Sequence, residues 1–196
     1  MRTLEGDRTA RRRERMSVYV ALLRAINVGG SNLIKMSALK ACFEAQELCD
    51  VSTYIASGNV LFTAGRENRE ALTTRVESAL SQTFSYSSRI VLRTRDEMQA
   101  TVDDAPKGFG AKPALYRYDV VFLKAPLTAD EAMQSMTARP GVDLVVPGDG
   151  VLYTSRLIAK ASQSQLSRIV GKPAYKNMTI RTWNVVKTLL ERMTRI

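Results

Sequence analysis

Val18-Tyr-Val-Ala-Leu-Leu-Arg24 and Tyr118-Asp-Val-Val-Phe-Leu-Lys124 decide the fold, because both stretches show the same order of residue types. In each, an apolar segment that is typical of a β-strand ends in a cation, and a segment with helical spacing follows. Ser57-Gly-Asn-Val-Leu-Phe-Thr63 and Gly148-Asp-Gly-Val-Leu-Tyr-Thr154 form a second matching pair, and each predicts a β-hairpin turn. Such internal repetition indicates one folding unit that is used twice.

Each copy has the element order of a split β-α-β unit. In the first copy, strands and helices are predicted in the order β-α-β-β-α-β, at residues 17–23, 36–47, 51–56, 60–64, 66–84 and 89–93. The second copy has predicted strands at 118–123, 142–146, 151–154 and 178–181, a helix after the capping box of Thr128 and Glu131, a helix at about 162–171, and a last helix. We therefore predict an α+β protein of two tandem ferredoxin-like (split β-α-β) repeats with antiparallel sheets.

The sequence divides into four regions. They are a disordered basic tail at 1–15, a first ferredoxin-like repeat at 16–94, a connecting helix and linker at 95–117, and a second repeat with a C-terminal helix at 118–196. The tail holds six arginines against three acidic residues and almost nothing apolar, which is typical of disorder. It lacks the apolar core of a secretory signal. Two interpretations fit this composition. The segment is a tail or an upstream start before Met16, where the folded pattern begins, or it is a dedicated arm that binds nucleic acid.

The chain is basic beyond its tail. Of 196 residues, 29 are Lys or Arg and 19 are Asp or Glu, which gives a formal net charge of +10. A surplus of this size favours polyanionic partners, here nucleic acid or a phosphorylated small molecule. No apolar run approaches the roughly 20 residues that cross a bilayer, so no membrane partner is predicted.

Histidine is absent and cysteine is rare, which excludes several chemistries. Without histidine there is no Ser-His-Asp triad, no His-paired nucleophilic cysteine and none of the common histidine zinc sites. The sequence predicts no metal site and no cofactor. Cys42 and Cys49 are the only cysteines, and we expect both to be reduced thiols, which predicts a cytoplasmic protein.

Polar residues near strand ends are the candidates for a ligand site. Arg24 ends an otherwise apolar strand, where a guanidinium needs carbonyls, an anionic ligand or a carboxylate such as Asp50. The Gly29-Gly30 loop beside Lys35 can form an anion-binding nest, or it can serve as a tight strand-to-helix turn. The predicted ligand-binding residues are Arg24, Asn27, Gly29, Gly30, Lys35, Ser57, Asn59, Arg181 and Asn184.

Three of these residues can share one site only under a geometric condition. Arg24 and Asn27 flank the exit of the first strand, whereas Asn59 follows the turn of the first hairpin. They meet only if that hairpin returns to the exit end of the first strand. We predict that it does.

Lys107-Gly-Phe-Gly110 copies the opening of the RNA-recognition signature. The next residues are Ala111-Lys-Pro113, and a proline breaks the strand on which the aromatic residues of that signature must lie. The stretch is therefore interpreted as part of the linker.

Three motifs in order give the chain a resemblance to a known family. Leu22-Leu-Arg-Ala-Ile-Asn-Val-Gly-Gly30, Tyr54-Ile-Ala-Ser-Gly-Asn-Val-Leu-Phe62 and Thr179-Ile-Arg-Thr-Trp-Asn184 resemble the uncharacterised bacterial family called domain of unknown function 1697. The resemblance runs from about residue 17 to the C-terminus, and it implies two ferredoxin-like halves in a cytosolic protein with no assigned reaction. The family's motif positions fall on Arg24, Asn27, Gly29, Gly30, Ser57, Gly58, Asn59, Arg181, Trp183 and Asn184. The chain departs from the family's usual residues at Ala25, Thr182 and Val185.

The sequence predicts an uncharacterised cytosolic protein that binds a phosphate-bearing ligand, either nucleic acid or a nucleotide. One alternative is an enzyme that acts on a small anionic metabolite without metal or histidine, so that a carboxylate, lysine, tyrosine or thiol supplies its acid-base group. Another is a homo-oligomeric protein-interaction module. The sequence leaves open whether the chain is an enzyme.

Overall fold

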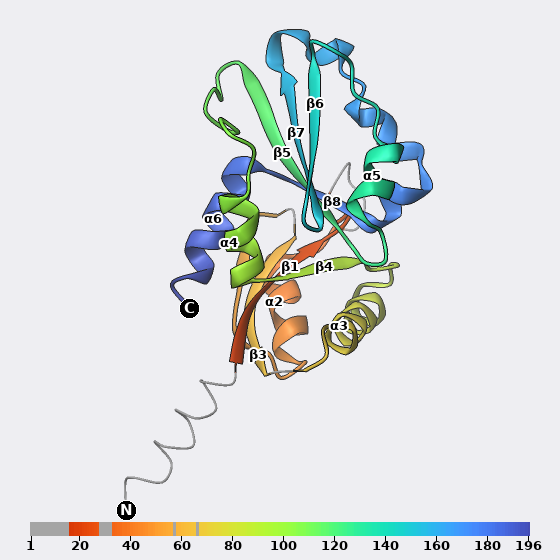
Figure 1. Ribbon diagram of the computed structural model, residues 1–196. Helices are drawn as coiled ribbons and strands as arrows, with labels where there is room; N and C mark the ends of the chain where they lie inside the picture. Colours follow the sequence, from red (N-terminus) through yellow and green to blue (C-terminus); the bar gives the residue numbers. More distant parts are fainter. Residues whose placement is uncertain (1–15, 28–32, 57, 66) are drawn as a thin grey trace, which may run out of the picture. The chain divides into compact units, whose positions relative to one another are not determined.

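The computed structural model describes residues 16–27, 33–56, 58–65 and 67–196 (Figure 1). The predicted tail at 1–15 lies outside these residues, as do Gly29, Gly30 and Ser57. The chain divides into two units: the first extends to Arg95 and includes Arg192–Ile196, and the second comprises Asp96–Glu191. Each unit contains a four-stranded antiparallel sheet, so the predicted fold class is confirmed.

The first unit has the element order of a ferredoxin-like fold. Its elements are β1 (Met16–Leu23), α2 (Met36–Glu44), β2 (Cys49–Tyr54), β3 (Asn59–Gly65), α3 (Arg69–Phe84) and β4 (Ile90–Thr94). The strands lie in the order β2-β3-β1-β4, and every neighbouring pair is antiparallel. The two central strands are therefore β3 and β1, which is the order that two interleaved β-α-β units produce.

Both helices of the first unit pack on one face of its sheet. Tyr19, Ala21 and Leu23 alternate along β1 and join a buried core with residues from α2 and α3. Phe62 of β3 is fully buried at the centre of this core. Its ring lies 5.7 Å from that of Tyr19 and 5.6 Å from that of Phe43, which belongs to α2.

The second unit has the same sheet as the first, but different helices pack against it. Its elements are α4 (Arg95–Asp103), β5 (Tyr116–Leu123), α5 (Ala129–Ser135), β6 (Asp143–Gly148), β7 (Val151–Leu157), the 3₁₀ helices η1 (Ile158–Gln163), η2 (Leu166–Gly171) and η3 (Pro173–Asn177), β8 (Met178–Thr182) and α6 (Trp183–Met193). The strand order β6-β7-β5-β8 matches that of the first unit. The capping box predicted at the start of α5 is confirmed, because Thr128 and Glu131 satisfy each other's backbone N–H groups.

The helix predicted at about 162–171 is wrong, because three short 3₁₀ helices replace it. Side chains in this segment compete for the backbone, as Ser164 Oγ accepts a hydrogen bond from the N–H of Leu166. The N–H of Gln165 donates a hydrogen bond to the Asp143 carboxylate at 2.9 Å. In the first unit α3 buries Leu72, Val76 and Leu80, whereas η1, η2 and η3 together bury only Ile169. The second sheet is therefore covered less completely at this position.

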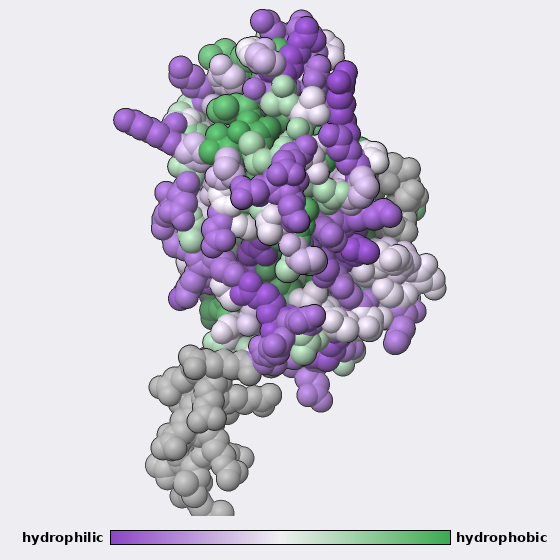
Figure 2. Space-filling model, turned by 45° about the vertical axis from the view of Figure 1, so that its right-hand side comes forward, coloured by the Kyte–Doolittle hydropathy of each residue, from purple (hydrophilic) through white to green (hydrophobic). Residues whose placement is uncertain are grey.

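Figure 2 shows one face of the molecule, where hydrophilic side chains surround a compact hydrophobic patch. Among the helices of the described residues, none combines the length and the apolar character that crossing a bilayer requires. Cys42 is buried and Cys49 half-buried, and both are free thiols.

Candidate ligand-binding site

The first hairpin does return to the exit end of β1. Leu22 pairs with Asn59, and the N–H of Leu23 donates to the Gly58 carbonyl at 2.8 Å. The side chain of Asn27 also reaches this hairpin, because its Nδ2 donates to the Ala56 carbonyl at 2.8 Å. The geometric condition for convergence is therefore met.

The amides that meet there are engaged with the backbone. Asn27 has φ of 53° and binds Ile34 in both directions, donating to its carbonyl at 3.1 Å and accepting from its N–H at 2.7 Å. Asn59 is fully buried and donates to the Tyr54 carbonyl at 2.9 Å. These bonds hold the β2–β3 hairpin and the segment before α2 in place. Lys35, just before α2, is exposed.

Arg24 does not form the ion pair with Asp50 that the sequence allowed. Within the described residues, Asp50 accepts a hydrogen bond from Thr63 Oγ1 at 2.9 Å, and Thr63 pairs with Val18. Val18 and Arg24 lie at opposite ends of β1, so the two charges are far apart. Arg24 is half-buried, and its backbone N–H donates to the Arg89 carbonyl at 3.0 Å.

Asn27→Ala is expected to destabilise the protein by about 2–3 kcal/mol, because three hydrogen bonds are lost and alanine is strained at positive φ. Thermal unfolding monitored by circular dichroism measures the loss. Asn27→Gly serves as the matched variant, since glycine relieves the backbone strain but not the missing bonds, and its loss should be smaller. An unchanged melting temperature for Asn27→Ala would show that these bonds contribute nothing to the fold.

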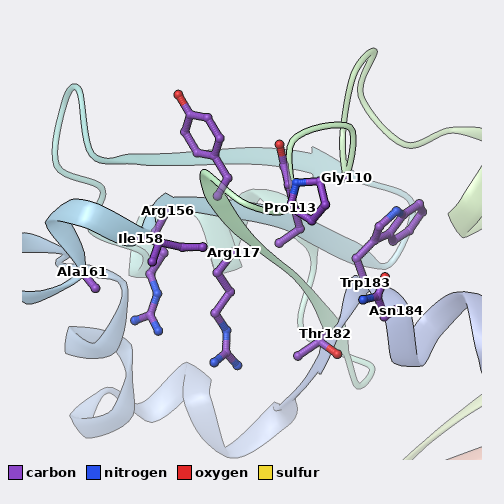
Figure 3. A pocket seen from close by; sticks show the side chains of 11 residues that line it. Gly110, Pro113, Arg117, Arg156, Ile158, Ala161, Thr182, Trp183 and Asn184 are labelled. Atoms are coloured by element: carbon purple, nitrogen blue, oxygen red, sulfur yellow. The ribbon is translucent and has the colours of Figure 1, made fainter.

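A pocket of about 450 Å³ in the second unit is lined by two arginines and by aromatic and polar side chains (Figure 3). We call it the arginine pocket. Its residues come from the linker, the first residues of β5, the end of β7, η1 and the β8–α6 junction. They are Gly110, Pro113, Tyr116, Arg117, Tyr118, Arg156, Ile158, Ala161, Thr182, Trp183 and Asn184.

Two arginines lie side by side on neighbouring strands in this pocket. Arg117 of β5 and Arg156 of β7 are direct cross-strand partners, and Figure 3 shows both side chains extending to the same side. Arg117 donates through Nε to Asp119 at 2.8 Å, and this bond raises the pKa of Arg117. In the part of the chain that the structure describes, no residue accepts a hydrogen bond from the terminal nitrogens of Arg117 or from the Arg156 guanidinium. Two donor groups are thus available on one wall.

Asp143 balances part of this positive charge. It is the cross-strand partner of Arg156 on β6. Burial raises the pKa of Asp143, but the N–H groups of Gln165 and Arg139, the hydroxyl of Ser164 and the nearby Arg156 charge outweigh burial and hold the pKa below its ordinary value. The carboxylate therefore stays ionised at neutral pH and is held by the backbone at 2.9 Å and 3.0 Å rather than by the guanidinium.

Trp183 forms a fixed wall of the pocket. Its ring meets the edge of Phe109 at 5.1 Å and an angle of 81°. Gly110 lies against the same ring with φ of +81°, and a Cβ there would come within 2.4 Å of Trp183 Cδ1 and Nε1. Glycine is required at this position, because any side chain would displace the tryptophan.

The two C-terminal candidates separate in the structure. Asn184 is exposed and lines the arginine pocket. Arg181 is buried and does not line it; its Nη1 donates to Thr179 Oγ1 and to the Ile180 carbonyl, both at 2.8 Å. Burial lowers the pKa of Arg181 to about 10.

Sequence reasoning missed Arg117 and Arg156 because both lie just outside the predicted strands. The prediction started the fifth strand at residue 118 and ended the seventh at residue 154, whereas β5 begins at Tyr116 and β7 ends at Leu157. The alternation of Tyr116, Arg117 and Tyr118 is the signal that could have extended the strand. Across the described residues, no group of three or more Cys, Asp or Glu side chains is placed to hold a metal ion.

Comparisons with known proteins agree with the fold. The family model described as "Protein of unknown function (DUF1697)" matches residues 16–153. A solved structure of a conserved bacterial protein from Streptococcus pneumoniae aligns with a TM-score of 0.78 and 22% sequence identity, over 91% of this chain and 99% of that chain. No curated protein matches. At this identity the structural likeness concerns the fold alone.

Proposed function

The chain belongs to the family described as protein of unknown function (DUF1697), and we propose that it binds a phosphate-bearing ligand, a nucleotide or nucleic acid, in the arginine pocket. The observation that carries the proposal is the direct opposition of Arg117 and Arg156 across β5 and β7. Like charges directly opposite each other destabilise a sheet. Asp119 and Asp143 offset part of that repulsion, and an anion between the two guanidinium groups would reduce it further.

The chemistry of the two arginines fits a phosphate group. A guanidinium presents several N–H donors in a fixed plane that matches the oxygens of a phosphate. In Arg117 only Nε is engaged, by Asp119, and Arg156 keeps all its donors. A phosphate held here would therefore receive charge-assisted hydrogen bonds from two strands at once.

The remaining wall of the pocket suits a ring with polar edges. Tyr116, Tyr118 and Trp183 supply aromatic surface, while Thr182 and Asn184 supply groups that donate and accept hydrogen bonds. The volume of about 450 Å³ is in the range of pockets that hold small organic ligands. A nucleotide combines the anion and the ring that these two walls require.

Trp183 gives a direct test, because it is the only tryptophan in the chain and lines the pocket. Titration with adenosine monophosphate and with pyrophosphate should change its fluorescence, and Arg156→Glu should weaken both by about tenfold or more. Arg168→Glu makes the same change of charge at an exposed residue of η2 that does not line the pocket, and it should leave both affinities within about twofold. Equal losses in the two variants would reduce the effect to net charge and contradict the site.

A further inference from the structure

A second pocket of about 330 Å³ adjoins the arginine pocket in the same unit. It is lined by the linker around Lys107 and Phe109, by the start of β6, and by Ser155 and Leu157 of β7. Tyr116 and Tyr118 line both pockets. The two cavities therefore share these two rings as a common border.

The two tyrosines are placed as a platform between the pockets. On β5 they alternate with Arg117, so the rings lie on one face of the strand and the guanidinium on the other. Their centroids are 6.0 Å apart, and Phe109 fixes Tyr118 by an edge contact at 4.9 Å. Within the described residues neither phenol hydroxyl has a hydrogen-bond partner. Rings of this kind, half-exposed and held in position, are what unpaired bases stack on.

Cations lie on both sides of this platform. Arg117 and Arg156 line the arginine pocket, and the exposed Lys107 lines the second pocket together with the carboxylate of Asp143. A ligand with one phosphate can use only one side. A ligand with phosphates spaced along a chain, and with a base between them, can use both sides and the rings.

We infer that the second unit binds single-stranded nucleic acid, with neighbouring nucleotides in the two pockets and a base against Tyr116 or Tyr118. The inference rests on the proposed function and specifies the ligand class. A duplex fits less well, because its bases are already stacked on each other and are not available to the rings. A free mononucleotide would leave the second pocket and Lys107 unused.

Chain length is the variable that tests the inference. Adenosine monophosphate, a 5′-phosphorylated dinucleotide, an eight-nucleotide single strand and the corresponding duplex are titrated into the full chain, as ribonucleotides and as deoxyribonucleotides. The dinucleotide should bind about tenfold more tightly than the mononucleotide, since stacking of one base adds about this much. The two sugar series show whether the protein prefers RNA or DNA.

Variants in the second pocket distinguish binding of a phosphate-bearing ligand in the arginine pocket from binding of single-stranded nucleic acid across both pockets. Lys107→Glu should weaken the eight-nucleotide strand about fivefold to tenfold and leave adenosine monophosphate unchanged, whereas Tyr116→Leu changes a ring that lines both pockets and should weaken both ligands. Lys176→Glu alters an exposed lysine in η3 that lines neither pocket and is the matched control. Equal affinity for mononucleotide and dinucleotide, or tighter binding of the duplex, overturns the inference and leaves the proposed function standing. Absence of binding by every probe overturns both.

Discussion

Replacing both arginines with glutamine, Arg117→Gln with Arg156→Gln, is expected to weaken binding of adenosine monophosphate by about a hundredfold or more. Each charge-assisted hydrogen bond contributes about 1.5–3 kcal/mol, and the double variant removes the bonds from both strands. The salt dependence of binding should fall as well, because fewer cations neutralise the ligand. Isothermal titration at two salt concentrations measures both effects.

The two single variants complete a double-mutant cycle. If one phosphate sits between the guanidinium groups, the losses should not be additive, because either change alone disturbs the shared anion. Arg139→Gln with Arg168→Gln removes the same charge from two exposed residues and should cost less than about threefold. Additive losses would mean that the arginines contact separate groups, and an unchanged affinity would remove the arginine pocket from the function.

Phe62→Ala is expected to reduce the free energy of unfolding of the first unit by about 3–5 kcal/mol. The side chain is fully buried and contacts the rings of Tyr19 and Phe43, so its removal leaves a cavity that the sheet and α2 cannot close. Chemical denaturation followed by circular dichroism in the far ultraviolet gives the value.

Phe62→Leu tests whether the lost volume is the cause. Leucine keeps most of the apolar volume and should cost no more than about 1.5 kcal/mol. If both variants cost the same, the ring contacts rather than the cavity dominate. If neither costs more than about 1 kcal/mol, the core of the first unit does not lie where the structure places it.

The repeat was predictable because short-range sequence patterns specify its strands and turns. The apolar alternation of β1 and β5 and the glycine turns beside β3 and β7 depend on residues that are adjacent in sequence. The 3₁₀ segment was not predictable in this way. Its periodicity suits a helix, but Asp143 on β6 competes for the N–H of Gln165, and that contact joins residues 22 positions apart.

The candidate site was only partly predictable for a related reason. The sequence shows Asn27 and Asn59 as polar residues without an evident role, but their partners are the carbonyls of Ala56, Ile34 and Tyr54. Every sequence supplies backbone carbonyls. The residue type alone therefore does not distinguish a polar side chain that hydrogen-bonds to the backbone from one that binds a ligand. The opposition of Arg117 and Arg156 depends on the register of two strands, which no single stretch reveals.

The three short 3₁₀ helices also have a consequence for the local stability of the second unit. Their hydrogen bonds span three residues instead of four and close only one or two turns, so they are weaker than those of a long α-helix. Amides in this segment should exchange with solvent through local unfolding at a low free energy, long before the strands beneath it do. Ala161 of η1 lines the arginine pocket. The wall that Ala161 contributes to the pocket therefore lies on backbone that we expect to open more readily than β5 and β7, the strands that carry the two arginines.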